Sequence, residues 1–327
     1  MIDLRQLRYF VAIVEQGSIS RAAGVLHVAQ PALSLHVRNM EAHLGTALLF
    51  RTPRGVEPTE AGTILLNHAR VILDQLTVAE EEIRGNLSDP SGDVRLGLPG
   101  TIAQILAVPL ITATHRRYPK IRLRIAEAMS GFVLEWLRDG RVDLAVLYGG
   151  AEEQGIAAQP VLEEELQFFA PAQPAPDEAL PPSGGLIAFR QVAGMPLILP
   201  GEGHGLRDQL ERVAITVDTA LNVMIDVDSY ANIKALVHEG LGCSILPRNA
   251  IAADAAAGSL RAWQIAGPAI RRRVFLAHSS ERPMTNAVAT IRNLARDTLR
   301  DLARNDEWAG AALVGDEQPV KQTARKG

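Results

Sequence analysis

Apolar positions near the start of the chain recur with a helical spacing. They step by three and four residues, which places them on one face of a helix: Leu4, Leu7, Phe10, Val11 and Val14. Gly17 ends this helix, and Ser18 is a favourable N-cap for a second helix over 19–26. A third helix is predicted over 29–44, where Pro31 falls in the first turn, a position that tolerates proline.

Two short strands and one long helix are predicted next. Residues 47–51 and 56–58 have a strand-like composition and flank a Thr-Pro-Arg-Gly turn. The helix over 59–87 carries apolar residues that step by four and three, as in a heptad seam: Leu65, Ala69, Ile72, Leu76, Ala79 and Ile83. Such a rod is roughly 40 Å long and cannot bury its seam alone, so we expect it to pair with a second copy. Arg70 is interpreted as a solvent-exposed residue of this helix.

After a Ser-Asp-Pro-Ser-Gly hinge at 88–92 the pattern changes to alternating strands and helices. This alternation predicts an α/β fold with a largely parallel sheet. The predicted strands are 94–98, 121–126, 143–147, 166–170, 197–199, 221–227, 243–246 and 271–277, and the helices are 102–117, 131–139 and 286–302. A crossing near 161–165 and a return near 265–271 indicate two lobes joined by two strands. The tail over 303–327 lacks periodicity and is predicted to be disordered.

Composition places the chain among globular proteins. Of its 327 residues, 47% are hydrophobic and 21% are charged, which suits two or three folding units. No run reaches the roughly 20 apolar residues of a membrane span, and the charged N-terminus is unlike a signal peptide. The single cysteine, Cys243, cannot form an internal disulfide. We therefore expect a cytoplasmic protein without a membrane partner.

The third helix has two chemically different faces. Its apolar face, which suits a core, consists of Leu33, Val37 and Met40. Its polar face consists of Gln30, Ser34 and Arg38. Glutamine and serine can hydrogen-bond to base edges, and arginine binds guanine or phosphate. The net charge of −4 does not exclude nucleic acid, because a DNA-binding module need be basic on only one face.

The turn between the two short strands carries a second candidate contact. Arg51 and Arg54 flank Thr52-Pro53, and Gly55 permits a tight turn. An arginine at such a tip suits the narrow minor groove or the DNA backbone. Ser18 and Ser20 lie at a helix N-terminus, where phosphate contacts are favourable.

In this order and spacing, the first segment resembles LysR-type transcriptional regulators. The resemblance rests on GSISRAAGVLHVAQPALSLHVRNMEAHLGTALLFR and TPRGVEPTEAG and extends to about Leu302. The runs LHVAQPALSLHVRNME and AVLYGGAEEQGIAAQPVLEEEL look most like the nitrogen assimilation control regulators of that family. The resemblance implies that Gln30, Pro31 and Ser34 enter the major groove. Leu35 departs from the family pattern, in which a polar or basic residue often stands.

The resemblance also implies a domain organisation. Residues 1–58 would form a winged helix-turn-helix, an all-α module with a small wing, and 59–88 a dimerising linker helix. The remaining α/β part, 93–302, would be an effector-binding domain with two lobes like those of periplasmic binding proteins. Lobe 1 would comprise 93–163 and 266–302, and lobe 2 would comprise 164–265.

Ligands of such folds bind beyond the carboxyl ends of strands, where helix N-termini point into a crevice. This rule predicts a cleft with two walls, although helix caps and glycine turns also occur without any ligand. The first wall would contain Gly100, Thr101, Ile102, Ser130 and Leu147, and the second Gly203 and His204. Free amides and the Thr101 hydroxyl suit a carboxylate or similar anion, so the expected effector is a small, anionic molecule.

These features predict a transcriptional regulator rather than an enzyme. Its expected partners are double-stranded DNA, a small-molecule effector, further copies of itself in a dimer or tetramer, and RNA polymerase. No cofactor or metal is expected, because the spacing of His27, His36 and His43 does not form a compact helical pair. The alternative is a cytoplasmic solute-binding receptor whose helix-turn-helix serves as a protein-interaction module.

Overall fold

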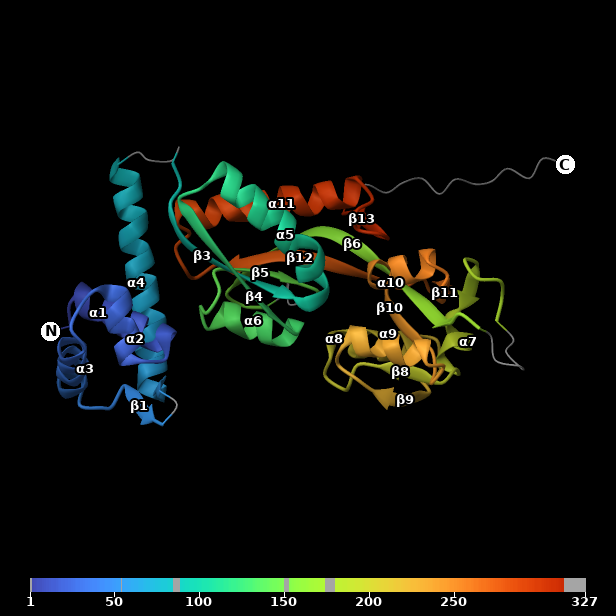
Figure 1. Ribbon diagram of the computed structural model, residues 1–327, viewed down its shortest axis with the longest axis horizontal. Coiled ribbons are helices and arrows are strands. Elements are labelled where there is room, and N and C mark those ends of the chain that lie inside the picture. Colours follow the sequence, from blue (N-terminus) through green and yellow to red (C-terminus); the bar gives the residue numbers. More distant parts are fainter. Residues whose placement is uncertain (1, 54, 85–88, 150–152, 174–179, 315–327) are drawn as a thin grey trace.

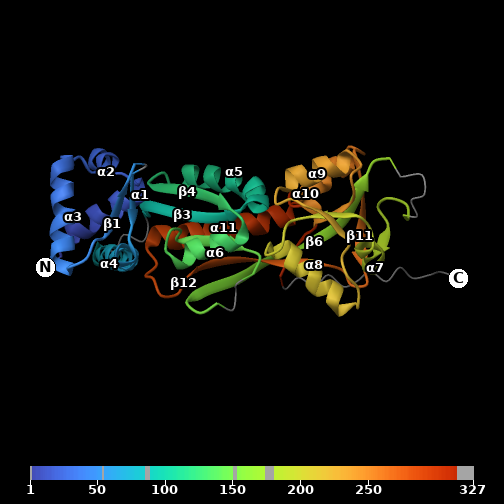
Figure 2. The same ribbon diagram turned by 90° about the horizontal axis from the view of Figure 1, so that it is seen from below.

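The computed structural model describes residues 2–53, 55–84, 89–149, 153–173 and 180–314. Its parts follow one another along the long axis of the molecule (Figure 1; Figure 2). The N-terminal helices lie at one end together with the long helix, the first α/β lobe lies in the middle, and the second lobe lies at the other end.

The N-terminal part consists of short helices and a β-hairpin. Its elements are α1 (Leu4–Gln16), α2 (Ile19–Leu26), α3 (Gln30–Leu44), β1 (Leu49–Thr52) and β2 (Gly55–Pro58). As predicted, Gly17 adopts a left-handed conformation after α1, and the Ser18 hydroxyl caps α2 by accepting a hydrogen bond from the Arg21 amide. Gly55 lets the hairpin approach the helices, because a Cβ there would lie 2.2 Å from the Gly17 carbonyl oxygen.

One face of the long helix α4 (Glu60–Arg84) packs on other parts of the chain, and the opposite face is exposed to solvent. Arg70 is buried, contrary to the sequence-based expectation, because the first lobe packs on that face. Its guanidinium donates to the Asp139 carbonyl oxygen and to the Glu15 carboxylate. On the opposite face, Ile72 is 46% exposed and Ile83 is 85% exposed. The predicted end of the helix, at 87, lies outside the described residues.

The first lobe confirms the predicted α/β fold. Its elements are β3 (Gly92–Pro99), α5 (Gly100–Arg117), β4 (Ile121–Ala128), α6 (Ser130–Arg138), β5 (Leu144–Leu147), β12 (Arg271–Ser279) and α11 (Asn286–Arg304). Strand β3 pairs in parallel with β4 and β5, and β12 runs antiparallel to β5. Helices α5 and α11 cover one face of the sheet and α6 covers the other (Figure 1). Strands β3 and β4 lead directly into α5 and α6, so two helix N-termini lie at the same edge of the sheet.

The second lobe shares a sheet with the first. Its helices are α7 (Phe189–Ala193), α8 (Gly205–Thr216), α9 (Tyr230–His238) and α10 (Arg248–Ala256), and its strands are β7 (Leu186–Ala188), β8 (Leu197–Leu199), β9 (Val223–Asp226), β10 (Ser244–Pro247) and β11 (Leu260–Ala266). Strand β6 (Ile156–Pro171) runs through both lobes, pairing with β12 in one and with β10 and β11 in the other. All three of these pairings are antiparallel, so the prediction of a largely parallel sheet is wrong: β6 is a long shared strand and not one of a series of strands joined by crossover helices. The predicted crossing is the middle of this strand, and the return joins β11 to β12.

The segment after α11 is ordered, which corrects the prediction of a disordered tail from residue 303. Trp308 is fully buried in the core of the first lobe, and β13 (Ala311–Leu313) pairs with the middle of β6. The Ala309 amide also donates to the Asn249 side chain of the second lobe. One buried indole and a three-residue strand hold this segment in place. Neither of them produces a periodic pattern in the sequence, which is why the prediction missed it. Residues 315–327 lie outside the described part.

Candidate DNA-binding surface and effector cleft

Helix α3 presents the predicted base-reading residues on the surface of the N-terminal part. Buried Leu33, Val37 and Met40 hold its inner face in a core shared with α1 and α2. Outside, the side chains of Gln30, Pro31 and Arg38 are exposed and that of Ser34 is half-buried. Leu35 is also on this surface, with 50% of its area exposed.

The hairpin and the start of α2 supply the remaining candidate contacts. Arg51 is exposed on β1, and Ser20 is exposed in the first turn of α2. The Ser18 oxygen accepts from the Arg21 amide at 3.3 Å, which leaves the hydroxyl proton available to a phosphate. Arg54 lies outside the described residues.

A network of ion pairs joins the N-terminal part to the first lobe. A Glu15 carboxylate oxygen lies 3.1 Å from a guanidinium nitrogen of Arg70 and 3.1 Å from one of Arg95. The Arg95 guanidinium also pairs with the Asp143 carboxylate at 2.7 Å. Because Glu15, Arg70 and Arg95 come from α1, α4 and β3, the network links the N-terminal helices to the first lobe.

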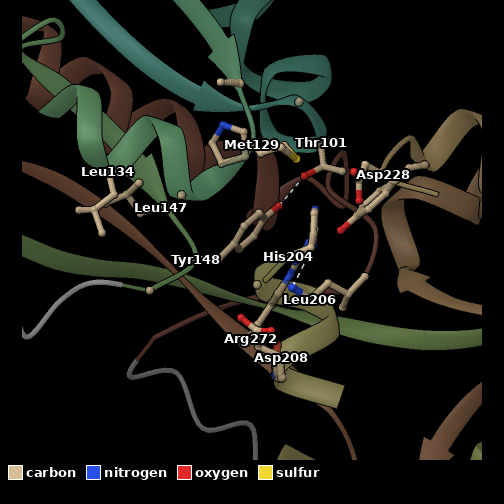
Figure 3. A pocket seen from close by; sticks show the side chains of 18 of the residues that line it. Thr101, Met129, Leu134, Leu147, Tyr148, His204, Leu206, Asp208, Asp228 and Arg272 are labelled. Carbon is tan, nitrogen blue, oxygen red and sulfur yellow. Dashed lines mark hydrogen bonds between the residues drawn. The ribbon is translucent and has the colours of Figure 1, made fainter. Parts of the chain in front are cut away.

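A cleft of about 1220 Å³ separates the two lobes (Figure 3). Five of the predicted residues line it: Gly100, Thr101, Leu147, Gly203 and His204. Ile102 does not, because the helical turn after Thr101 directs its side chain into the core, where it is fully buried. Ser130 begins α6 between the lining residues Met129 and Gly131, but its side chain lies outside the described part.

The floor of the cleft contains a polar cluster that joins the predicted Thr101 to residues that the sequence patterns did not predict. The Thr101 and Tyr148 hydroxyls lie 2.8 Å apart, and the Arg272 guanidinium lies over the Tyr148 ring, 3.5 Å from its centroid (Figure 3). Arg272 donates from Nε to the Glu164 carboxylate, whose other oxygen accepts from the Trp308 indole at 3.1 Å. Because Glu164 lies on β6 and Arg272 on β12, this cluster connects both strands to the cleft.

Burial affects the protonation of the groups in this cluster. Burial raises the pKa of Tyr148 well above its ordinary value, so its hydroxyl stays neutral. Burial opposes the charge of Arg272, but the Glu164 carboxylate outweighs that effect and the pKa of Arg272 is raised. Burial and the Arg272 charge lower the pKa of His204. The Nδ1 atom of His204 accepts from the Leu206 amide at 3.2 Å and so caps α8.

The cleft is lined by charged residues of both signs. Its acidic lining residues are Glu127, Glu163, Asp208 and Asp228, and its arginines are Arg212, Arg271, Arg272 and Arg273. A Cβ on Gly100, at the N-terminus of α5, would lie 2.9 Å from a Glu127 carboxylate oxygen. The Glu127 carboxylate therefore lies beside the N-terminus of α5.

Two further properties of the described residues bear on function. None of the described helices combines the length and apolar character of a membrane span. Within the same residues, no group of three or more histidine, cysteine or acidic side chains is placed to hold a metal ion.

Comparisons with known proteins agree with this architecture. Residues 4–63 match the bacterial regulatory helix-turn-helix of the lysR family, and residues 88–300 match the LysR substrate binding domain. The nitrogen assimilation regulatory protein nac of Klebsiella aerogenes is 33% identical over 296 residues, 89% of this chain and 94% of that protein.

Solved structures show the same arrangement. A full-length OxyR variant from Pseudomonas aeruginosa has a TM-score of 0.75 and 26% identity, covering 92% of this chain and 98% of that one. Full-length CbnR in complex with its target DNA shares the fold, with a TM-score of 0.58 and 22% identity over 91% of this chain and 100% of that one. The relatives are transcriptional regulators and not enzymes. The chain belongs to the LysR family of transcriptional regulators, with a DNA-binding helix-turn-helix and an effector-binding domain.

Proposed function

We propose that the chain binds an inverted-repeat operator as a homo-oligomer, and that a small molecule in the cleft between the lobes changes this binding. The observation that carries the proposal is the outer face of α3, which exposes Gln30, Pro31 and Arg38 while the inner face is held in a core. In a helix-turn-helix the second helix of the motif enters the major groove in this way. Ser34 adds a further donor to the same contact.

The remaining DNA contacts are made to the phosphates and the minor groove. Arg51 and Arg54 of the wing bind the minor groove or its phosphates, and Ser18 and Ser20 bind phosphates near the start of α2. These contacts orient the module without reading sequence, whereas the α3 contacts select the bases.

The exposed apolar residues support an oligomer. Ile72 and Ile83 on α4 form an open seam that a second α4 would cover. Val108 on α5 and Ile215 on α8 are also exposed, on different lobes, and would allow effector domains to pair into a tetramer. Such a regulator acts in the bacterial cytoplasm and contacts RNA polymerase from the operator.

Footprinting tests the proposal. The purified protein is incubated with the DNA upstream of its own gene, at one fixed salt concentration and with excess competitor DNA, because phosphate contacts make affinity strongly dependent on salt. We expect protection of two inverted half-sites about one or two helical turns apart. Diffuse, easily competed binding would contradict the proposal and favour the solute-receptor alternative.

Filling the cleft should separate effector response from DNA binding. Thr101→Trp places an indole against Tyr148 in the first turn of α5, so we expect loss of the regulatory response with operator affinity within about twofold of wild type. The measurement is a reporter gene behind the footprinted operator, under the growth condition that changes wild-type expression most. Thr101→Ser keeps the hydroxyl and should respond normally. A normal response from Thr101→Trp would contradict the placement of the effector.

A further inference from the structure

Helix α3 carries an apolar side chain at the centre of its outward face. Leu35 is 50% exposed, whereas Leu33, Val37 and Met40 are buried. At 3.6 residues per turn, Leu35 points about 170° away from the mean direction of those three residues. No other position of the helix between Pro31 and Arg38 points more directly away from the core.

The neighbours of Leu35 belong to the proposed base-reading surface. Pro31 lies one turn before it and Arg38 nearly one turn after it, and both side chains are exposed. If α3 enters the major groove by this face, Leu35 enters with them and reaches the bases rather than the phosphates. Its side chain has no hydrogen-bonding atom, so it can add to the free energy of DNA binding only by contact with another apolar group.

We propose that Leu35 packs against the C5-methyl group of a thymine and so selects thymine in the operator. This inference rests on the proposed DNA-binding function and adds one recognised base to it. The thymine methyl is the apolar group that distinguishes the four base pairs in the major groove. A polar base edge facing Leu35 would instead lose its hydrogen bonds to water without replacement, which is costly.

Deoxyuridine substitution tests the contact, because it removes the methyl group and keeps the base pair. Each thymine of the protected half-site is replaced in turn, and affinity is measured at fixed salt. We expect one position at which wild-type affinity falls about fourfold, the equivalent of one buried methyl group. In Leu35→Ala the same substitution should have little further effect. The salt dependence of binding should be the same in both proteins, since leucine contacts no phosphate.

Val25→Ala provides the matched control. Val25 is an aliphatic residue on α2 that is 59% exposed, but it faces the gap between the N-terminal part and the first lobe. This variant should keep the full deoxyuridine effect, and neither variant should change the unfolding temperature, because both side chains are on the surface.

Two results would overturn the inference while leaving the operator footprint intact. One is wild-type binding that no deoxyuridine weakens, which would show that Leu35 contacts no thymine methyl group. The other is an equal deoxyuridine effect in wild type and Leu35→Ala. Failure to protect any operator is distinguishable from both, since it overturns the proposed function and the thymine contact together.

Discussion

Glu164→Ala is expected to lower the free energy of unfolding by about 3–5 kcal/mol, the cost of leaving a buried charge without its partner. Glu164 and Arg272 are both buried where the two lobes meet. Removing the carboxylate leaves the guanidinium without its counter-charge and the Trp308 indole without its acceptor. Urea unfolding of the full-length protein, followed by circular dichroism, measures the change.

The adjacent glutamate is a natural control for this variant. Glu163 pairs with Arg273, which is mostly exposed, so Glu163→Ala should cost less than about 1 kcal/mol. If Glu164→Ala does not fold, Glu164→Gln keeps the shape of the side chain and provides a milder variant. The double variant Glu164→Leu with Arg272→Met should recover much of the lost stability, because it removes both charges. Equal losses for Glu163→Ala and Glu164→Ala would refute the importance of the buried pair.

Ile72→Asp combined with Ile83→Asp is expected to give a protein that no longer dimerises and binds the operator at least about 100-fold more weakly. The aspartates place like charges on the open seam of α4, where two helices would otherwise bury isoleucine. Without the dimer each DNA-binding module binds its half-site independently, and the gain from linked binding is lost. Sedimentation measures the oligomeric state and footprinting measures the affinity.

A charge placed elsewhere on α4 controls for effects on the helix itself. Thr77 is exposed and lies about a third of a turn away from the seam, so Thr77→Asp should leave the dimer and the operator affinity unchanged. A double aspartate variant that remains dimeric would show that α4 is not the dimerising element.

The local pattern of the sequence was sufficient to predict most of the fold. Helix α2 begins and ends where the Ser18 cap and the apolar spacing predict, and β8 occupies the predicted 197–199. Such elements depend on neighbours in the chain, which a sequence shows directly. The long strand β6 was predicted only in part, because its continuity comes from pairing with distant strands in both lobes.

The cleft was less predictable than the fold. Strand ends identified Thr101 and Leu147, and the same rule could have found Tyr148, the next residue along. Arg272 lies in a run of three arginines, and only the pairing of β12 with β6 decides that it is buried while its neighbours are exposed. Arg70 was misjudged for a similar reason, since the surface that buries it belongs to another domain.

The segment between α11 and Val314 affects how the effector domain can be prepared on its own. Strand β13 covers residues Leu162, Glu163 and Glu164 of β6 along the edge opposite β12. A domain ending at Leu302, where the helical periodicity stops, would expose that edge and remove Trp308 from its core. Unpaired strand edges promote intermolecular pairing and aggregation. An effector domain intended for ligand screening should therefore extend at least to Val314.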